Sequence, residues 1–155
     1  MRIGLISDTH GRLRSEVLAH FRGLDLILHA GDVGDADVLT MLEVIAPVEA
    51  VYGNTDGFAL RNWLQAELVR GVDGHRLVLV HGDRFGTPTP DRLRAAWPDA
   101  DIVVFGHTHK PLLERLGSAL FVNPGAAGAA RFQLRPSIAI LDTAGLPPAV
   151  RFIEL

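Results

Sequence analysis

Short apolar runs bounded by turn residues recur along the chain and constrain its fold more than any other feature. They cover residues 2–7, 24–30, 48–53, 76–82, 101–106, 119–123, 137–142 and 149–155. Their length is that of a buried strand and falls far short of the roughly 20 residues that span a bilayer. Between the first runs lie helical patterns at 12–22 and 35–45. This alternation predicts a mostly parallel sheet with strands buried on both faces.

The second half of the chain adds antiparallel hairpins and one more helix. Asp-Gly at 73–74 is a strong two-residue hairpin signal, and Gly-Ser at 117–118 is a weaker one. Thr89 can cap a helix that Pro98 stops. Two mixed sheets packed face to face with helices outside bury this many strands, so we expect a four-layer α/β/β/α sandwich within a single domain, residues 1–155.

Composition limits the chemistry and the partners. The chain has 155 residues, no cysteine and a net charge of −3, with its basic residues scattered. Nucleic-acid binding is not indicated, because it depends on a dense basic patch. The N-terminus shows no signal-peptide core, so we expect a cytoplasmic protein without a membrane segment. Without thiolates, any metal must be held by nitrogen and oxygen ligands.

Polar side chains stand where the predicted strands end. Because the carboxyl ends of parallel strands meet at one edge of a sheet, we expect these side chains to converge. Glycines stand beside several of them and let the backbone turn sharply and approach closely. The residues in question are Asp8, His10, Asp32, Asn54, His81, His107 and His109.

The number and kind of these groups indicate a dinuclear metal site. Seven ligands are too many for one zinc-like ion but suit two ions about 3.5 to 4 Å apart that share a carboxylate. Imidazole, carboxylate and amide oxygen together favour divalent Mn, Fe, Ni, Co or Zn. The chance alternative, in which loop residues are grouped without function, is disfavoured by the repetition of the pattern.

Five motifs in order make the sequence resemble the calcineurin-like metallophosphoesterases, and most closely their small single-domain YfcE-type phosphodiesterases. A further match, "NPGA", lies at 123–126. Motifs at ordered spacing are a specific signal. The five are "SDTHG" at 7–11, "GDV" at 31–33, "GNTD" at 53–56, "VHGD" at 80–83 and "GHTHKP" at 106–111.

The resemblance implies a role for each candidate residue. By motif, the first metal would be bound by Asp8, His10 and His109, the second by Asn54, His81 and His107, and Asp32 would bridge the two. Asp32, His10 and Asn54 are also expected to take part in catalysis. Two divalent ions per chain, manganese first among them, would activate a bridging hydroxide for attack on phosphorus.

Two positions depart from the family pattern. Where the family often has a histidine that assists the leaving group, this chain has Thr55, and where "NPGS" often has serine it has Ala126. Loss of a general acid typically costs about 10² to 10⁴ in rate and falls hardest on poor leaving groups. We therefore expect activity on aryl phosphodiesters and weaker action on simple alkyl phosphates.

Alternatives stay open for function and for several residues. A eukaryotic retromer subunit keeps this fold as a protein-binding scaffold and also lacks the assisting histidine. We expect the substrate to be a small phosphodiester or phosphomonoester, and relatives of this size often form homodimers or homotetramers.

Among single residues, His29 is a partner beneath the site or an ordinary core histidine, and Asp83 orients a histidine or closes a turn. Asp35 and Asp56 are read as helix or turn caps, and Arg12, Lys110 and Arg131 as phosphate contacts or solvated charges.

Overall fold

The first sheet contains three parallel strands joined by helices. The computed structural model describes residues 1–129 and 134–155. In this sheet the order is β10-β9-β1-β2-β3, and β9 runs antiparallel to both of its neighbours, β1 and β10. Its strands are β1 (Arg2–Ile6), β2 (Leu26–Ala30), β3 (Val48–Val51), β9 (Ser137–Asp142) and β10 (Ala149–Glu154).

The second sheet has the order β4-β5-β6-β8-β7, with three parallel strands in the middle and an antiparallel strand at each edge. Both predicted hairpins are present, β4 with β5 and β7 with β8. The strands are β4 (Glu67–Val72), β5 (His75–Val80), β6 (Ile102–Phe105), β7 (Leu112–Leu116) and β8 (Ala119–Asn123).

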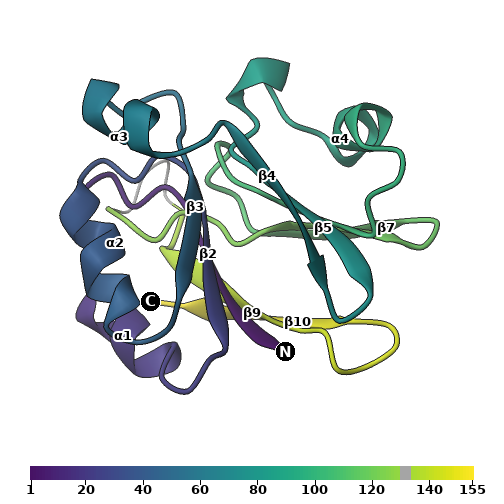
Figure 1. Ribbon diagram of the computed structural model, residues 1–155, viewed down its shortest axis with the longest axis horizontal. Coiled ribbons are helices and arrows are strands. Elements are labelled where there is room, and N and C mark those ends of the chain that lie inside the picture. Colours follow the sequence, from purple (N-terminus) through teal and green to yellow (C-terminus); the bar gives the residue numbers. More distant parts are fainter. Residues whose placement is uncertain (130–133) are drawn as a thin grey trace.

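The two sheets face each other and carry helices on their outer sides (Figure 1). Between the sheets, β1, β2 and β9 pack their apolar side chains against β5, β6 and β8. The outer face of the first sheet packs on α1 (Ser15–His20) and α2 (Ala36–Glu43), and that of the second on α4 (Pro90–Ala96). β2 and β6 are covered on both faces, so every residue of these two strands is buried, and the predicted α/β/β/α sandwich is confirmed.

Helix boundaries differ from the sequence expectation in ways that follow from capping. The first helix is shorter than 12–22, because Arg14 provides no side-chain cap and a turn precedes it. The other two begin at the expected caps, since Asp35 accepts a hydrogen bond from the Asp37 amide and Thr89 from the Arg92 amide. In the described residues, no helix has the length and apolar character to cross a membrane.

One helix was not expected from the sequence. This is α3 (Phe58–Trp63), a short helix that follows β3 and buries only Leu60. Its aromatic ends, Phe58 and Trp63, are 82% and 57% exposed. With so little of it buried, the segment has no apolar periodicity to reveal it. A one-turn 3₁₀ helix, η1 (Asp83–Phe85), follows β5, so Asp83 takes part in a turn.

Candidate metal centre

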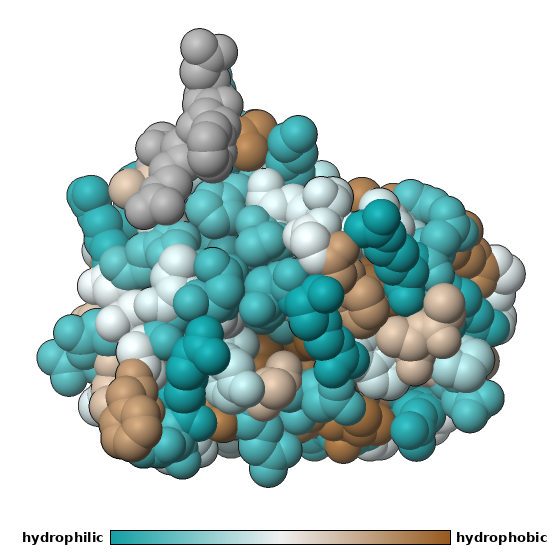
Figure 2. Space-filling model, turned by 90° about the horizontal axis from the view of Figure 1, so that it is seen from above, coloured by the Kyte–Doolittle hydropathy of each residue, from teal (hydrophilic) through white to brown (hydrophobic). Residues whose placement is uncertain are grey.

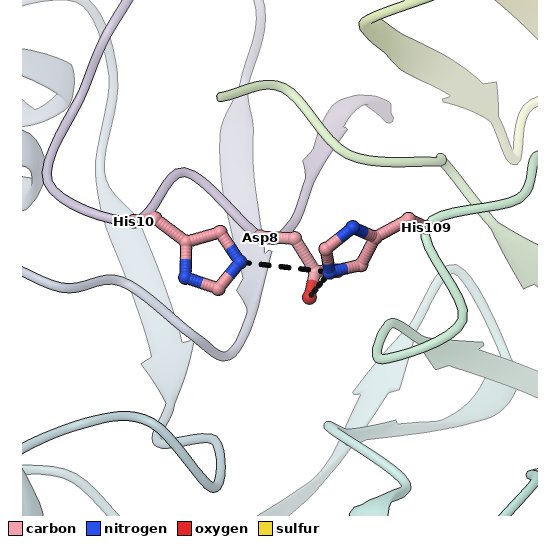
Figure 3. Close-up of side chains that lie close together, drawn as sticks. All are labelled: Asp8, His10 and His109. Carbon is pink, nitrogen blue, oxygen red and sulfur yellow. Dashed lines mark hydrogen bonds and ion pairs between the residues drawn. The ribbon is translucent and has the colours of Figure 1, made fainter. Parts of the chain in front are cut away.

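The strand ends bring all seven candidate residues together at one edge of the sandwich. One group consists of Asp8 and His10, which follow β1, and His109, which follows β6 (Figure 3). The Nε2 of His109 lies 3.1 Å from Asp8 Oδ1 and 3.5 Å from His10 Nε2. These three are the residues that the resemblance assigns to a first metal, and one ligand atom from each lies within 4.8 Å of the other two.

The remaining candidates continue from this group. His81 Nε2 lies 3.5 Å from Asp32 Oδ2 and 3.2 Å from Asn54 Oδ1. Asn54 Oδ1 is also 3.1 Å from His107 Nδ1. The same Asp32 Oδ2 also lies 4.0 Å from Nε2 of His10, which belongs to the first group. Asp32 therefore stands between the two groups, where a bridging ligand would have to be.

The backbone at the candidate ligands is held in an uncommon conformation. A positive φ is rare outside glycine, costs of order 1–3 kcal/mol and clusters at functional sites. Asp73, in a hairpin turn, is the one other non-glycine residue of the described chain with a positive φ. Five candidates share this conformation: Asp8 (54°), His10 (49°), Asp32 (52°), His107 (69°) and His109 (60°).

Glycines allow these strained turns to approach one another. A Cβ on Gly53 would run into the Asp32 carboxylate and lie 2.5 Å from its backbone nitrogen. A Cβ on Gly31, whose φ is +90°, would lie 2.7 Å from the His81 ring. Both glycines precede candidate ligands, so the close approach predicted from the sequence is confirmed at these positions.

The donor set fits divalent cations. Asp8 Oδ2 accepts a hydrogen bond from Ser7 Oγ at 2.6 Å, whereas its buried Oδ1 accepts none from the described residues. His81 Nδ1 donates to the Ala30 carbonyl at 2.8 Å, which directs Nε2 toward Asp32 and Asn54. In both Asp8 and His81, one polar atom is thus fixed by a hydrogen bond and the other polar atom faces the cluster. Ligands in metal sites are commonly oriented by a second hydrogen bond in this way.

Charge and burial make the centre of the cluster strongly polar. Burial alone would raise the pKa of Asp32, but the hydrogen bonds and charge of His81, with the Thr55 amide, hold that pKa far below its usual range. Burial alone would lower the pKa of His81, but its hydrogen bond with Asp32 and the charges of Asp8 and Asp32 raise it to about 8. Below that pH, a proton occupies the place where a cation would bind.

Asp56 joins two loops of the site and does not cap a helix, contrary to the expectation from its position in the sequence. It was expected to cap a helix or turn, but the N-cap of α3 is Gly57, and the Asp56 carboxylate is 4% exposed. It accepts hydrogen bonds from the amides of Gly34 at 2.7 Å, Gly53 at 2.8 Å and Val33 at 3.2 Å. It therefore ties the loop after β2 to the loop after β3.

Arg61 on α3 was missed altogether. Its guanidinium donates to the carbonyls of Gly53 and Asn54, both at 3.1 Å, and to that of Asp56 at 2.8 Å. The same group lies over the Tyr52 ring at 4.9 Å. Arg61 thus holds the backbone that presents Asn54. No sequence signal marks it, because α3 itself gives none.

Other residues near the motifs support the loops. Asn123 Nδ2 donates to the Gly106 carbonyl at 2.8 Å and to Thr108 at 3.1 Å, so it holds the Gly-His-Thr-His turn. His29 lies beneath the site, fully buried, with Nε2 2.9 Å from the Thr9 hydroxyl. Arg12 and Lys110 are exposed, and Arg131 lies outside the described residues.

The fold and the cluster define a two-sheet α/β protein with a candidate dinuclear metal centre at the strand ends. A family model, the calcineurin-like phosphoesterase superfamily domain, matches residues 1–145. The chain therefore belongs to the calcineurin-like phosphoesterases, and the resemblance read from its motifs is confirmed.

Relatives place the chain more closely within this family. A probable metallophosphoesterase of Methanothermobacter thermautotrophicus is 36% identical over 152 residues, which cover 94% of this chain and 87% of the relative. Phosphodiesterase YfcE of Escherichia coli K12 is 30% identical over 165 residues, covering 92% and 88%.

Solved structures agree with the fold. That of an archaeal phosphodiesterase, 28% identical, superposes with a TM-score of 0.84 over 100% of both chains. Vps29 of Entamoeba histolytica, solved as a complex with Zn²⁺, superposes with a TM-score of 0.82 over 99% of both chains at 21% identity, which shows the shared fold alone.

Proposed function

We propose that this protein is a phosphodiesterase that hydrolyses a P–O bond with the help of two divalent metal ions, manganese first among them. The observation that carries the proposal is the convergence of carboxylate, imidazole and amide groups from both sheets at one edge. Homologues named metallophosphoesterase and phosphodiesterase support the same reaction class. We further propose a cytoplasmic location, which suits a chain without cysteine, and self-association into a dimer or tetramer.

Each candidate residue has a defined part in the proposal. Asp8, His10 and His109 would hold one cation, Asn54, His81 and His107 the other, and Asp32 both. Two cations bound there would supply charge stabilisation for the phosphate and an activated water for in-line attack. The protein contributes rigid positioning, through buried carboxylates and loops that Asp56 and Arg61 hold in place.

The leaving group receives no proton from an imidazole at position 55. The Thr55 hydroxyl is 3.4 Å from His10 Nδ1, and its amide donates to Asp32 at 2.9 Å. Because a threonine hydroxyl does not ionise near neutral pH, we expect hydrolysis to depend steeply on the pKa of the leaving alcohol. Thr55→His should reduce this dependence in a series of alkyl and aryl diesters, while Thr55→Ser should not. An unchanged slope in Thr55→His contradicts this account.

A scaffold function is the second candidate. The exposed aromatic side chains of α3, Phe58 and Trp63, are the observation that favours it, because large exposed apolar residues often mark protein contacts. Seen from above, however, the face onto which the strand ends open is mostly hydrophilic with separate hydrophobic patches (Figure 2). Seven polar groups gathered at one place also have no use in a pure scaffold.

Metal reconstitution separates the two functions. Metal-stripped protein is titrated with Mn²⁺ while bound metal per chain and hydrolysis of bis-p-nitrophenyl phosphate are measured together. We expect activity to saturate near two metals per chain. His107→Ala should lose more than about tenfold of this activity, whereas the matched control His20→Ala, outside the site, should keep it. Binding of two metals without turnover favours the scaffold, and no binding refutes the metal centre.

A further inference from the structure

A cavity of about 430 Å³ opens directly beside the candidate metal centre. Its walls come from the connection between β5 and α4, at 86–90, and from the connection between β6 and β7. His107 and Thr108 line it, so one wall of the cavity is also part of the metal cluster. A phosphate held at the cluster would therefore have its ester group at the mouth of this cavity.

The cavity is already formed and its walls are fixed. The Arg92 guanidinium donates to the carbonyls of Phe85 at 2.7 Å and Thr87 at 3.1 Å, which pins the 86–90 connection. Pro88 is buried and packs against Gly82, the residue after His81. On the other side, Thr108 is held by Asn123. Sites that take small molecules are usually preformed in this way.

The lining has the chemistry of a subsite for a flat ring. The partly exposed Leu112 supplies apolar surface, and the buried Pro88 and Phe105 form the apolar base of the cavity behind it. Threonine hydroxyls stand among them, and that of Thr89, which accepts a hydrogen bond from the Arg92 amide, still has its proton to donate. Apolar walls with hydroxyls between them match an aromatic ring that has apolar faces and polar edges.

The charge of the lining points to an anionic ester. Among the described residues that line the cavity, Lys110 carries the one permanent charge and no carboxylate is present. A phosphodiester keeps one negative charge beside its ester group, so Lys110 complements it across the mouth.

We propose that this cavity binds the ester group that stays on the phosphate, and that the substrate is a phosphodiester of an aromatic alcohol or a nucleoside. This inference rests on the proposed phosphodiesterase function and deepens it. It explains what a diester offers that a monoester lacks, namely a second group that the protein can recognise. An aromatic alcohol and a nucleoside both offer the cavity an aromatic ring.

The test keeps the leaving group constant and varies the group that remains. Three p-nitrophenyl diesters are compared with Mn²⁺-loaded protein, their second group being methyl, phenyl or thymidine 5′. We expect kcat/KM for the phenyl and thymidine esters to exceed that for methyl by about tenfold or more, as burial of a ring provides. A thymidine ester that is faster than the phenyl ester identifies a nucleoside, and equal rates identify a plain aromatic group.

Two variants tie the preference to the cavity. Thr87→Trp fills it from one side and Leu112→Ala removes apolar surface from the other, so both should lower the phenyl-to-methyl ratio at least several-fold. Because a ratio is measured within one preparation, partial loss of folded protein does not affect it. The matched control, Ser118→Trp in the β7–β8 turn, should leave the ratio unchanged.

The outcomes distinguish this inference from the function on which it rests. If the wild-type protein hydrolyses all three esters equally, or if both cavity variants keep the wild-type ratio, the subsite is refuted while the phosphodiesterase stands. If none of the three is hydrolysed by protein with two metals bound, the proposed function fails and the subsite fails with it.

Discussion

Replacing Asp56 by asparagine tests whether one buried carboxylate holds the loops of the site together. Its two oxygens accept three amide hydrogen bonds, at 2.7, 2.8 and 3.2 Å, from the loops after β2 and β3. Hydrogen bonds to a charged group contribute about 1.5–3 kcal/mol each. Asparagine keeps one acceptor oxygen and turns its NH₂ group toward an amide that then has no partner. The expected loss is about 2–4 kcal/mol of unfolding free energy.

Asp35 provides a matched control, because it was read from the sequence in the same way. Its exposed side chain accepts one hydrogen bond, from the Asp37 amide at 2.9 Å, and asparagine caps helices as well as aspartate does. Asp35→Asn should change stability by less than about 0.5 kcal/mol. Urea unfolding followed by circular dichroism, with EDTA present so that metal does not contribute, measures both. Equal changes in the two variants would refute the reasoning.

Three further predictions follow from close approach and from charge. Gly53→Ala should abolish metal binding at Asp32, since its Cβ collides with that carboxylate, while Gly71→Ala, whose Cβ meets nothing within 4 Å, should bind metal normally; metal analysis after dialysis decides this. Burial lowers the pKa of His29 to about 4, from 6.5 in the unfolded chain. The folded protein therefore resists protonation there, and stability is lost as the pH falls below 6.5, by roughly 2 kcal/mol at pH 5. The difference in unfolding free energy between pH 7 and pH 5 should shrink by that amount in His29→Gln, and an unchanged difference contradicts it. Because the metal-free pKa of His81 is raised to about 8, affinity for the second metal should fall about tenfold per pH unit below that value, measurable by chelator competition; a flat profile between pH 6 and 8 would exclude this coupling.

Sequence reasoning succeeded where the signal is local or periodic. The inner strands β2 and β6 are recognisable as mainly apolar runs because both of their faces are covered. Thr89 and Asp35 could be identified as caps because a cap acts on the amides two or three residues ahead. The hairpin at Asp73 was equally visible, since its turn needs a residue that tolerates positive φ followed by glycine.

It failed where the partners are distant in the chain. Asp56 stands beside a helix start, but its amide partners at 33 and 34 lie on another loop, and no local pattern reveals that. Arg61 acts through carbonyl groups, which every residue has, so its three hydrogen bonds leave no mark in the sequence. The positive φ of His10 and His107 could not be predicted either, because histidine, unlike glycine, does not indicate that conformation in a sequence.

Because the candidate ligands are divided between the two sheets, the site can form only after both sheets have folded and packed together. Asp8, His10, Asp32 and Asn54 follow strands of the first sheet, and the three other histidines follow strands of the second. Neither sheet supplies all seven residues, so a chain truncated before β6 lacks His107 and His109. Cations bound at the proposed site would cross-link the two sheets at this edge and would resist any sliding of one sheet over the other.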